Sequence, residues 1–111
     1  MAQKTSFIKK DIGDLLRNLF HEKGLDISQI ILFGSYAKQT ESEESDIDLI
    51  IVSPNFRDKS LFERVELTTG VDRTLVKTFK KPFDLMFYSD IEWNRLRSPV
   101  IEAAKQEGQI L

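Results

Sequence analysis

The segment Ile31–Val52 limits what this chain can fold into more than any other stretch. It holds two short apolar runs, separated by a Gly-Ser pair and a polar stretch, with the length and composition of buried strands. The second run opens with two acids, Asp46 and Asp48, which on a strand share one face about 7 Å apart along the chain. Paired acids at the end of a buried strand repel each other and resist desolvation. We therefore expect a bound cation to neutralise them.

Size and composition restrict the class of protein. A chain of 111 residues fits one domain, residues 1–111, and leaves no room for a separate substrate domain. The net charge of −2 gives no reason for wholesale binding to nucleic acid. The chain has no cysteine, so metal ligands must be oxygens or the single His21, for which we expect a surface or structural role. Because no apolar leader or membrane-length segment is present, we expect a cytoplasmic protein without a membrane partner.

Hydrophobic periodicity and turn signals predict the order helix, strand, strand, helix, strand, helix, helix. Two Ser-x-x-Glu capping boxes and a Ser-Pro pair mark three helix starts. The predicted elements are a helix over 7–23 ended by Gly24, strands over 28–33 and 46–52, a helix from Ser60 to Phe79 weakened at Gly70, a strand over 83–88, and helices opened by Ser89 and by Ser98 and ended by Gly108. The expected class is α/β (α+β), a small mixed β-sheet flanked by helices.

A third acid completes the candidate metal site. Asp84 lies on the third strand and, if this strand neighbours the second, reaches the same face as Asp46 and Asp48. Three carboxylates without a matching Arg or Lys in either strand favour a hard divalent cation. We expect Mg²⁺, as two ions, with Mn²⁺ as the alternative, and assign the catalytic and metal-binding roles to these three aspartates.

The Gly34-Ser35 pair is the predicted phosphate site. A strand-to-helix turn there exposes backbone N–H groups, with Ser35 placed to cap a helical turn over 36–38. We place Gly34, Ser35, Lys38 and Ser45 on the nucleotide, although a solvated role for Lys38 is equally open. Metal-held carboxylates beside a phosphate turn suit nucleotidyl transfer from a nucleoside triphosphate.

This pattern resembles the DNA polymerase β-like nucleotidyltransferase superfamily, and in particular its minimal, stand-alone bacterial and archaeal members. The resemblance is carried by Gly34-Ser35, ten intervening residues and Asp46-Ile47-Asp48, with Phe83-Asp84-Leu85 as the third carboxylate, and covers about residue 30 to the end of the sequence. It implies the polymerase β-like fold, with Gly34 and Ser35 on the triphosphate, Asp46 and Asp48 bridging metals, and Asp84 completing the catalytic metal site. Minimal members are often encoded beside a small helical HEPN-type protein. Some act as antitoxins that transfer AMP from ATP onto a tyrosine of that toxin.

Several assignments stay open at the level of sequence. Arg64, Arg73 and Lys77 lie on the long predicted helix, and the sequence does not choose which contacts the triphosphate. Trp93 is expected to pack in the core rather than on a base. We expect the acidic side chains between residues 41 and 44 to point to solvent.

The leading hypothesis is a metal-dependent nucleotidyltransferase that moves AMP from ATP onto a HEPN-type partner protein. The alternative is a binding module that neutralises its partner by contact alone. An Asp-x-Asp glycosyltransferase fits the short chain poorly, and transfer to RNA 3′ ends or to antibiotics stays open. The sequence does not fix the base preference or the oligomeric state.

Overall fold

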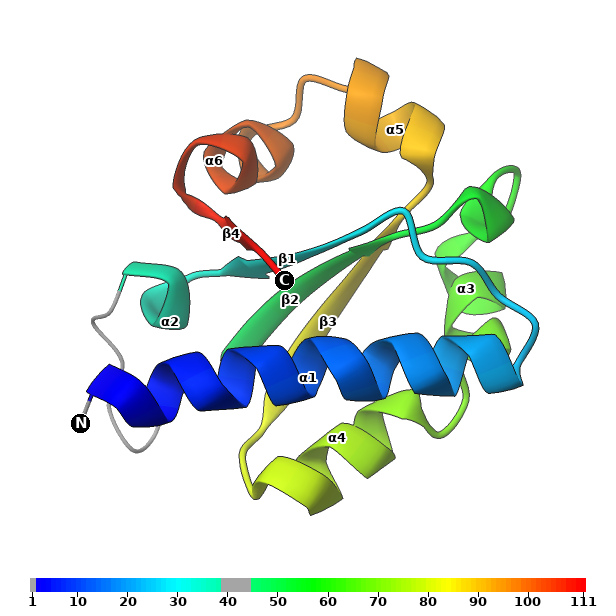
Figure 1. The fold of residues 1–111 in the computed structure, drawn as a ribbon. Coiled ribbons are helices and arrows are strands. Elements are labelled where there is room, and N and C mark those ends of the chain that lie inside the picture. Colours follow the sequence, from blue (N-terminus) through cyan, green and yellow to red (C-terminus); the bar gives the residue numbers. More distant parts are fainter. Residues whose placement is uncertain (1, 39–44) are drawn as a thin grey trace.

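The chain, seen here in a computed structural model, is described over residues 2–38 and 45–111, with residues 2–8 as backbone alone. The strands of this part are β1 (Gln29–Phe33), β2 (Ile47–Val52), β3 (Phe83–Tyr88) and β4 (Gln109–Ile110). They form one mixed sheet in the order β3-β2-β1-β4 (Figure 1). β2 pairs antiparallel with β1 and parallel with β3, while β1 pairs antiparallel with β4. The expected small mixed sheet flanked by helices is confirmed.

Helices cover both faces of this sheet (Figure 1). They are α1 (Ala2–Glu22), α2 (Ser35–Lys38), α3 (Leu61–Leu67), α4 (Val71–Phe79), α5 (Asp90–Arg95) and α6 (Pro99–Glu107), with a 3₁₀ turn η1 (Pro54–Phe56) after β2. Alternate residues of the strands enter two separate cores. Ile47, Leu49 and Ile51 pack against α1 and α4, while Ile50 and Val52 pack against α5 and α6. Both apolar faces of β2 are therefore buried, as the sequence predicts for a sheet covered on both sides.

The helix starts follow the predicted caps. Ser60 and Ser89 each accept from the backbone N–H of a glutamate three residues on, and that glutamate accepts from the serine N–H. Ser98 caps α6 in the same way through the Ile101 N–H. At the end of α1, Gly24 takes a φ of +71°, a left-handed conformation that glycine adopts at little cost.

The single helix predicted from Ser60 to Phe79 is wrong, because the structure has α3 and α4 there. Gly70 takes a φ of +88° and precedes α4. The hydroxyls of Thr68 and Thr69 donate to backbone carbonyls in the last turn of α3. These carbonyls therefore have hydrogen-bond partners although the helix ends there. Strand β4 was not predicted at all. Within the described residues, no helix is long and apolar enough to cross a membrane.

Candidate active site

The turn between β1 and α2 approaches the second strand very closely. Gly34 has a φ of +75°, and its carbonyl accepts from the N–H groups of Ala37 and Lys38 at 3.1 and 3.2 Å. A Cβ atom built on Gly34 would lie 2.2 Å from Oδ2 of Asp48. Only glycine therefore fits, both for the backbone angle and because the Asp48 carboxylate occupies the space of a side chain.

Two of the three predicted aspartates are direct neighbours across the sheet. β2 and β3 run parallel with Asp48 opposite Asp84 in the register, so both side chains leave the sheet on the same face. Neighbouring strands lie about 4.8 Å apart, which brings the two carboxylates within reach of one ligand. The third, Asp46, precedes β2 and is exposed to solvent. The register thus brings Asp48 and Asp84 together near the Gly34 turn, while the predicted convergence of all three aspartates on a metal stays a prediction.

The surroundings of Asp48 disfavour the ionised form of its carboxyl group. Burial raises the pKa of the Asp48 carboxyl, and the charges of Asp84 and Asp46 raise it further. The ion pairs formed among residues 2–38 and 45–111 involve none of these aspartates. Like charges held together without a balancing cation destabilise the folded state, and a divalent cation would reverse that penalty.

These residues suit a metal ion that keeps other ligands. In the described part of the chain, no three His, Asp or Glu side chains converge closely enough to hold an ion by themselves. Asp48 and Asp84 supply a pair, and the Gly34 backbone closes one side of it. Mg²⁺ is commonly bound by one or two carboxylates, with water and substrate phosphates as its remaining ligands. The donor set therefore fits Mg²⁺ carried in with a triphosphate better than a closed structural site.

The other predicted nucleotide contacts are placed as follows. Ser35 is the first residue of α2 rather than the residue before it, so the predicted cap is off by one position. Lys38 forms an ion pair with Glu107 of α6 at 3.1 Å, with both side chains about half exposed. Ser45 directly precedes Asp46. The loop expected over residues 39–44, with its three glutamates, lies outside the described residues.

The structure gives one of the three basic side chains of the predicted long helix a different role and leaves the triphosphate contact open between the other two. Arg64 is buried, and its guanidinium binds the Phe87 carbonyl at 2.8 Å, the Lys59 carbonyl at 3.0 Å and Glu92 at 2.7 Å. It therefore belongs to the far end of β3, about 10 Å along the strand from Asp84. Arg73 and Lys77 are exposed on α4.

Two single-residue expectations agree with the structure. Trp93 is buried in the core beneath α5, with the Lys105 ammonium 5.3 Å from its ring centroid. His21 is exposed in the last turn of α1.

One residue near the site escaped the sequence analysis. Gln109 of β4 donates to the Ala37 carbonyl at 2.7 Å and accepts from Lys9 of α1 at 2.6 Å. Its side chain ties the helix that follows Gly34 to two distant parts of the chain. A two-residue strand carries no periodic signal, so its local sequence could not have identified this role.

Comparison with known proteins agrees with this architecture. Residues 14–111 match the family described as "Nucleotidyltransferase domain", so the chain belongs to the nucleotidyltransferase domain family. This is the family level that the resemblance of its motifs implied. A segment of 44 residues is 41% identical to the "Putative protein adenylyltransferase MJ1305" of Methanocaldococcus jannaschii. That match covers 40% of this chain and 30% of the relative's length.

Solved structures share the fold at low sequence identity. A nucleotidyltransferase from Sulfolobus solfataricus, titled as putative, is 14% identical with a TM-score of 0.62, over 98% of this chain and 84% of its own. A toxin-antitoxin structure with AMP-PNP is 20% identical with a TM-score of 0.61, over 87% of this chain and 69% of that one. A mutant of the toxin-antitoxin MntA-HpeT is 23% identical with a TM-score of 0.56, over 89% and 70%.

Proposed function

We propose that this nucleotidyltransferase uses Mg²⁺ and ATP to transfer AMP onto a hydroxyl group of a partner protein, a small helical HEPN-type toxin. The observation that carries the proposal is the register of Asp48 with Asp84 beside the Gly34 turn. The acceptor class is supported by the similarity to a putative protein adenylyltransferase of M. jannaschii and to proteins of toxin-antitoxin pairs.

The residues have distinct roles in this reaction. Asp48 and Asp84 would hold Mg²⁺, with Asp46 adding negative charge at the strand entrance, while the backbone N–H groups of Gly34 and Ser35 would receive the triphosphate. When bound, Mg²⁺ supplies positive charge to the phosphates and to the leaving group. The acceptor oxygen forms a bond to the α-phosphorus as the bond from that phosphorus to the β-phosphate oxygen breaks. Pyrophosphate leaves, and Asp84 takes the proton of the acceptor hydroxyl.

The test uses the protein encoded by the neighbouring gene as acceptor. With ATP labelled at the α-phosphate and Mg²⁺, we expect the label on the acceptor and one pyrophosphate released per label. Asp84→Asn is the control and should transfer no label, although it keeps the same shape. Absence of label from ATP, GTP, CTP and UTP alike would overturn the proposal.

A second candidate function, neutralisation by contact alone, is favoured by one observation. Leu61, Phe62 and Val65 of α3 are 69, 73 and 51% exposed, an unusual set of apolar side chains for one short helix. The two functions separate in the double variant Asp46→Asn/Asp48→Asn. If this variant still neutralises the partner fully, contact alone is sufficient; if neutralisation is lost while the complex still forms, transfer is required.

A further inference from the structure

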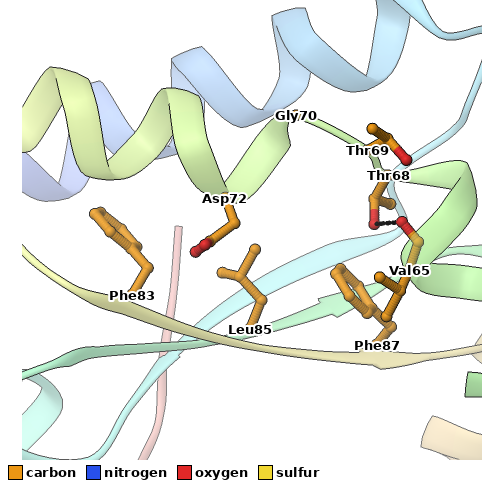
Figure 2. A pocket seen from close by; sticks show the side chains of 8 residues that line it. All are labelled: Val65, Thr68, Thr69, Gly70, Asp72, Phe83, Leu85 and Phe87. Atoms are coloured by element: carbon orange, nitrogen blue, oxygen red, sulfur yellow. Dashed lines mark hydrogen bonds between the residues drawn. The ribbon is translucent and has the colours of Figure 1, made fainter. Parts of the chain in front are cut away.

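A groove beside β3 lies apart from the residues assigned to the metal and the nucleotide. It has a volume of about 460 Å³ and lies on the sheet face opposite Asp48 and Asp84. Figure 2 shows Phe83, Leu85 and Phe87 rising from β3 on one side, with α3 and the start of α4 on the other. The groove therefore follows the length of β3, an edge strand of the sheet.

The backbone of β3 is open toward this side. The Pro82 carbonyl accepts from the Ile47 N–H of β2 at 2.9 Å, and the Tyr88 carbonyl accepts from the N–H of Ser53, directly after β2, at 3.0 Å. The even-numbered residues of β3 therefore direct their backbone groups at β2. Because backbone groups alternate along a strand, Phe83, Leu85 and Phe87 direct theirs away from β2. The Phe87 carbonyl is taken by Arg64. In the sheet formed by the described residues, Phe83 and Leu85 have no neighbouring strand on this side.

The open edge also lacks the usual protection against pairing. Natural sheets protect their edges with short strands, prolines, lysines or bulges. The opposite edge follows this rule, since β4 is only two residues long. β3 is six residues long and contains no proline or lysine, and its one charged residue, Asp84, lies on the face opposite the groove. An unprotected edge of this length is a template for another strand.

The lining of the groove indicates the chemistry of the occupant. The hydroxyl of Thr68 donates to carbonyls of α3, and that of Thr69 donates to the Glu66 carbonyl, so both donors are already used. Among the described residues that line the groove, Asp72 alone is charged. The open polar groups are thus those of the β3 backbone, and the rest is mainly apolar. An extended polypeptide with apolar side chains on one face matches this better than a base, a sugar or a phosphate.

We propose that β3 binds an extended segment of the acceptor protein as an added strand, and that this pairing delivers the acceptor hydroxyl to the active site; the inference rests on the proposed function. The residue of the added strand that pairs with Asp84 points its side chain to the same face of the sheet as Asp84. The two strands lie about 4.8 Å apart. Its two neighbours in the segment then turn their side chains into the groove. The acceptor sequence is a Tyr, Ser or Thr flanked on both sides by apolar residues.

Residue-resolved amide hydrogen exchange tests the pairing. The probe is the capped peptide Lys-Val-Thr-Val-Tyr-Val-Thr-Val-Lys, and its fully N-methylated analogue, which cannot form a strand, is the control. We expect the Phe83 and Leu85 amides to exchange quickly in the free protein and at least tenfold more slowly with the probe. The Asp84 and Met86 amides, which face β2, provide the internal reference and should change little. Unchanged exchange at Leu85 overturns the proposal, as does protection without peptide that grows with protein concentration, which means a second copy on the edge.

A matched pair of variants tests whether binding in the groove brings the acceptor hydroxyl to the active site. Thr69→Lys places a long charged side chain in the groove, whereas Asn94→Lys adds the same charge at an exposed site on α5, across the sheet. We expect Thr69→Lys to raise the KM for AMP transfer to the tyrosine of the probe at least tenfold, with Mg²⁺–ATP binding unchanged, and Asn94→Lys to match the parent chain. Equal KM values for both variants overturn the inference. If the parent chain does not bind Mg²⁺–ATP, the proposed function fails, while the exchange measurement still decides the pairing.

Discussion

Two partly buried carboxylates lie near opposite ends of β3, and their surroundings shift their pKa values in opposite directions. At its C-terminal end, burial alone would raise the pKa of Glu92, yet the Arg64 guanidinium and the hydrogen bonds from Ser89 hold that pKa below its usual range. At its N-terminal end, burial and the charges of Asp84 and Asp46 raise the pKa of Asp48. The first arrangement stabilises the fold. The second costs stability and is retained, which is typical of a site that waits for a ligand.

The largest expected effect is on catalysis at the N-terminal end. Asp48→Asn and Asp84→Asn should each lower AMP transfer by about 10³-fold, because an amide neither carries the charge that binds Mg²⁺ nor accepts the proton. Thermal unfolding should show that neither variant is less stable than the parent chain. A variant that unfolds early would contradict the view that these acids serve function at the expense of stability.

A substitution at the C-terminal end of β3 should instead lower the stability of the fold. Arg64→Met should lower the free energy of unfolding by about 3 kcal/mol, because it leaves the Phe87 carbonyl and the Glu92 carboxylate without their buried partner. Urea unfolding measures this, and the double variant Arg64→Met/Glu92→Met should regain much of the loss. Arg57→Ala, which removes an exposed pair with Asp90, is the control and should leave the midpoint nearly unchanged. An equal effect of the two arginine variants would contradict the comparison.

A pair of glycines measures how closely the turn presses on Asp48. Gly24→Ala faces open space at a φ of +71°, so it should cost only the strain of a left-handed alanine, about 1 kcal/mol. Gly34→Ala has a similar φ but meets Oδ2 of Asp48, so it should cost about 3 kcal/mol. Denaturant unfolding of both variants gives the difference. Adding Asp48→Ala to Gly34→Ala should remove most of it; if it does not, the close contact is not the cause.

The smallest effect is the dependence of stability on pH. Because the pKa of Asp48 is higher in the folded than in the unfolded chain, the folded state holds its proton more tightly. Stability should therefore fall as pH rises from the unfolded value, near 4, through the raised folded value. Solvent screening limits the loss to on the order of 0.5 kcal/mol. The difference in free energy of unfolding between the parent chain and Asp48→Asn, followed from pH 3 to pH 7, should grow with pH, and Mg²⁺ with ATP should reverse it.

The sequence predicts those features of the fold and the candidate site that depend on residues close together along the chain. Strand alternation places Asp46 and Asp48 on one face of the second strand, and serine–glutamate spacing locates the starts of α3 and α5. That Asp84 joins Asp48 depends on the pairing of β2 with β3, which the sequence analysis could only assume. The break at Gly70 is harder to predict, because apolar residues continue at helical spacing on both sides of it.

What the sequence could not supply is long-range pairing. Nothing local to β1 indicates that it lies between β2 and β4, and nothing near Lys38 indicates that it meets Glu107. The buried role of Arg64 has the same origin, since its partners come from a strand and a helix more than twenty residues away.

Gln109 extends this long-range dependence to the active site itself. Its amide connects Ala37, three residues after Gly34, with Lys9 near the other end of the chain. A side chain 72 positions from Ala37 in sequence therefore supports α2, the helix that directly follows the Gly34 turn. Gln109→Asn, which shortens that side chain by one methylene, would remove this support without replacing any residue assigned to the nucleotide.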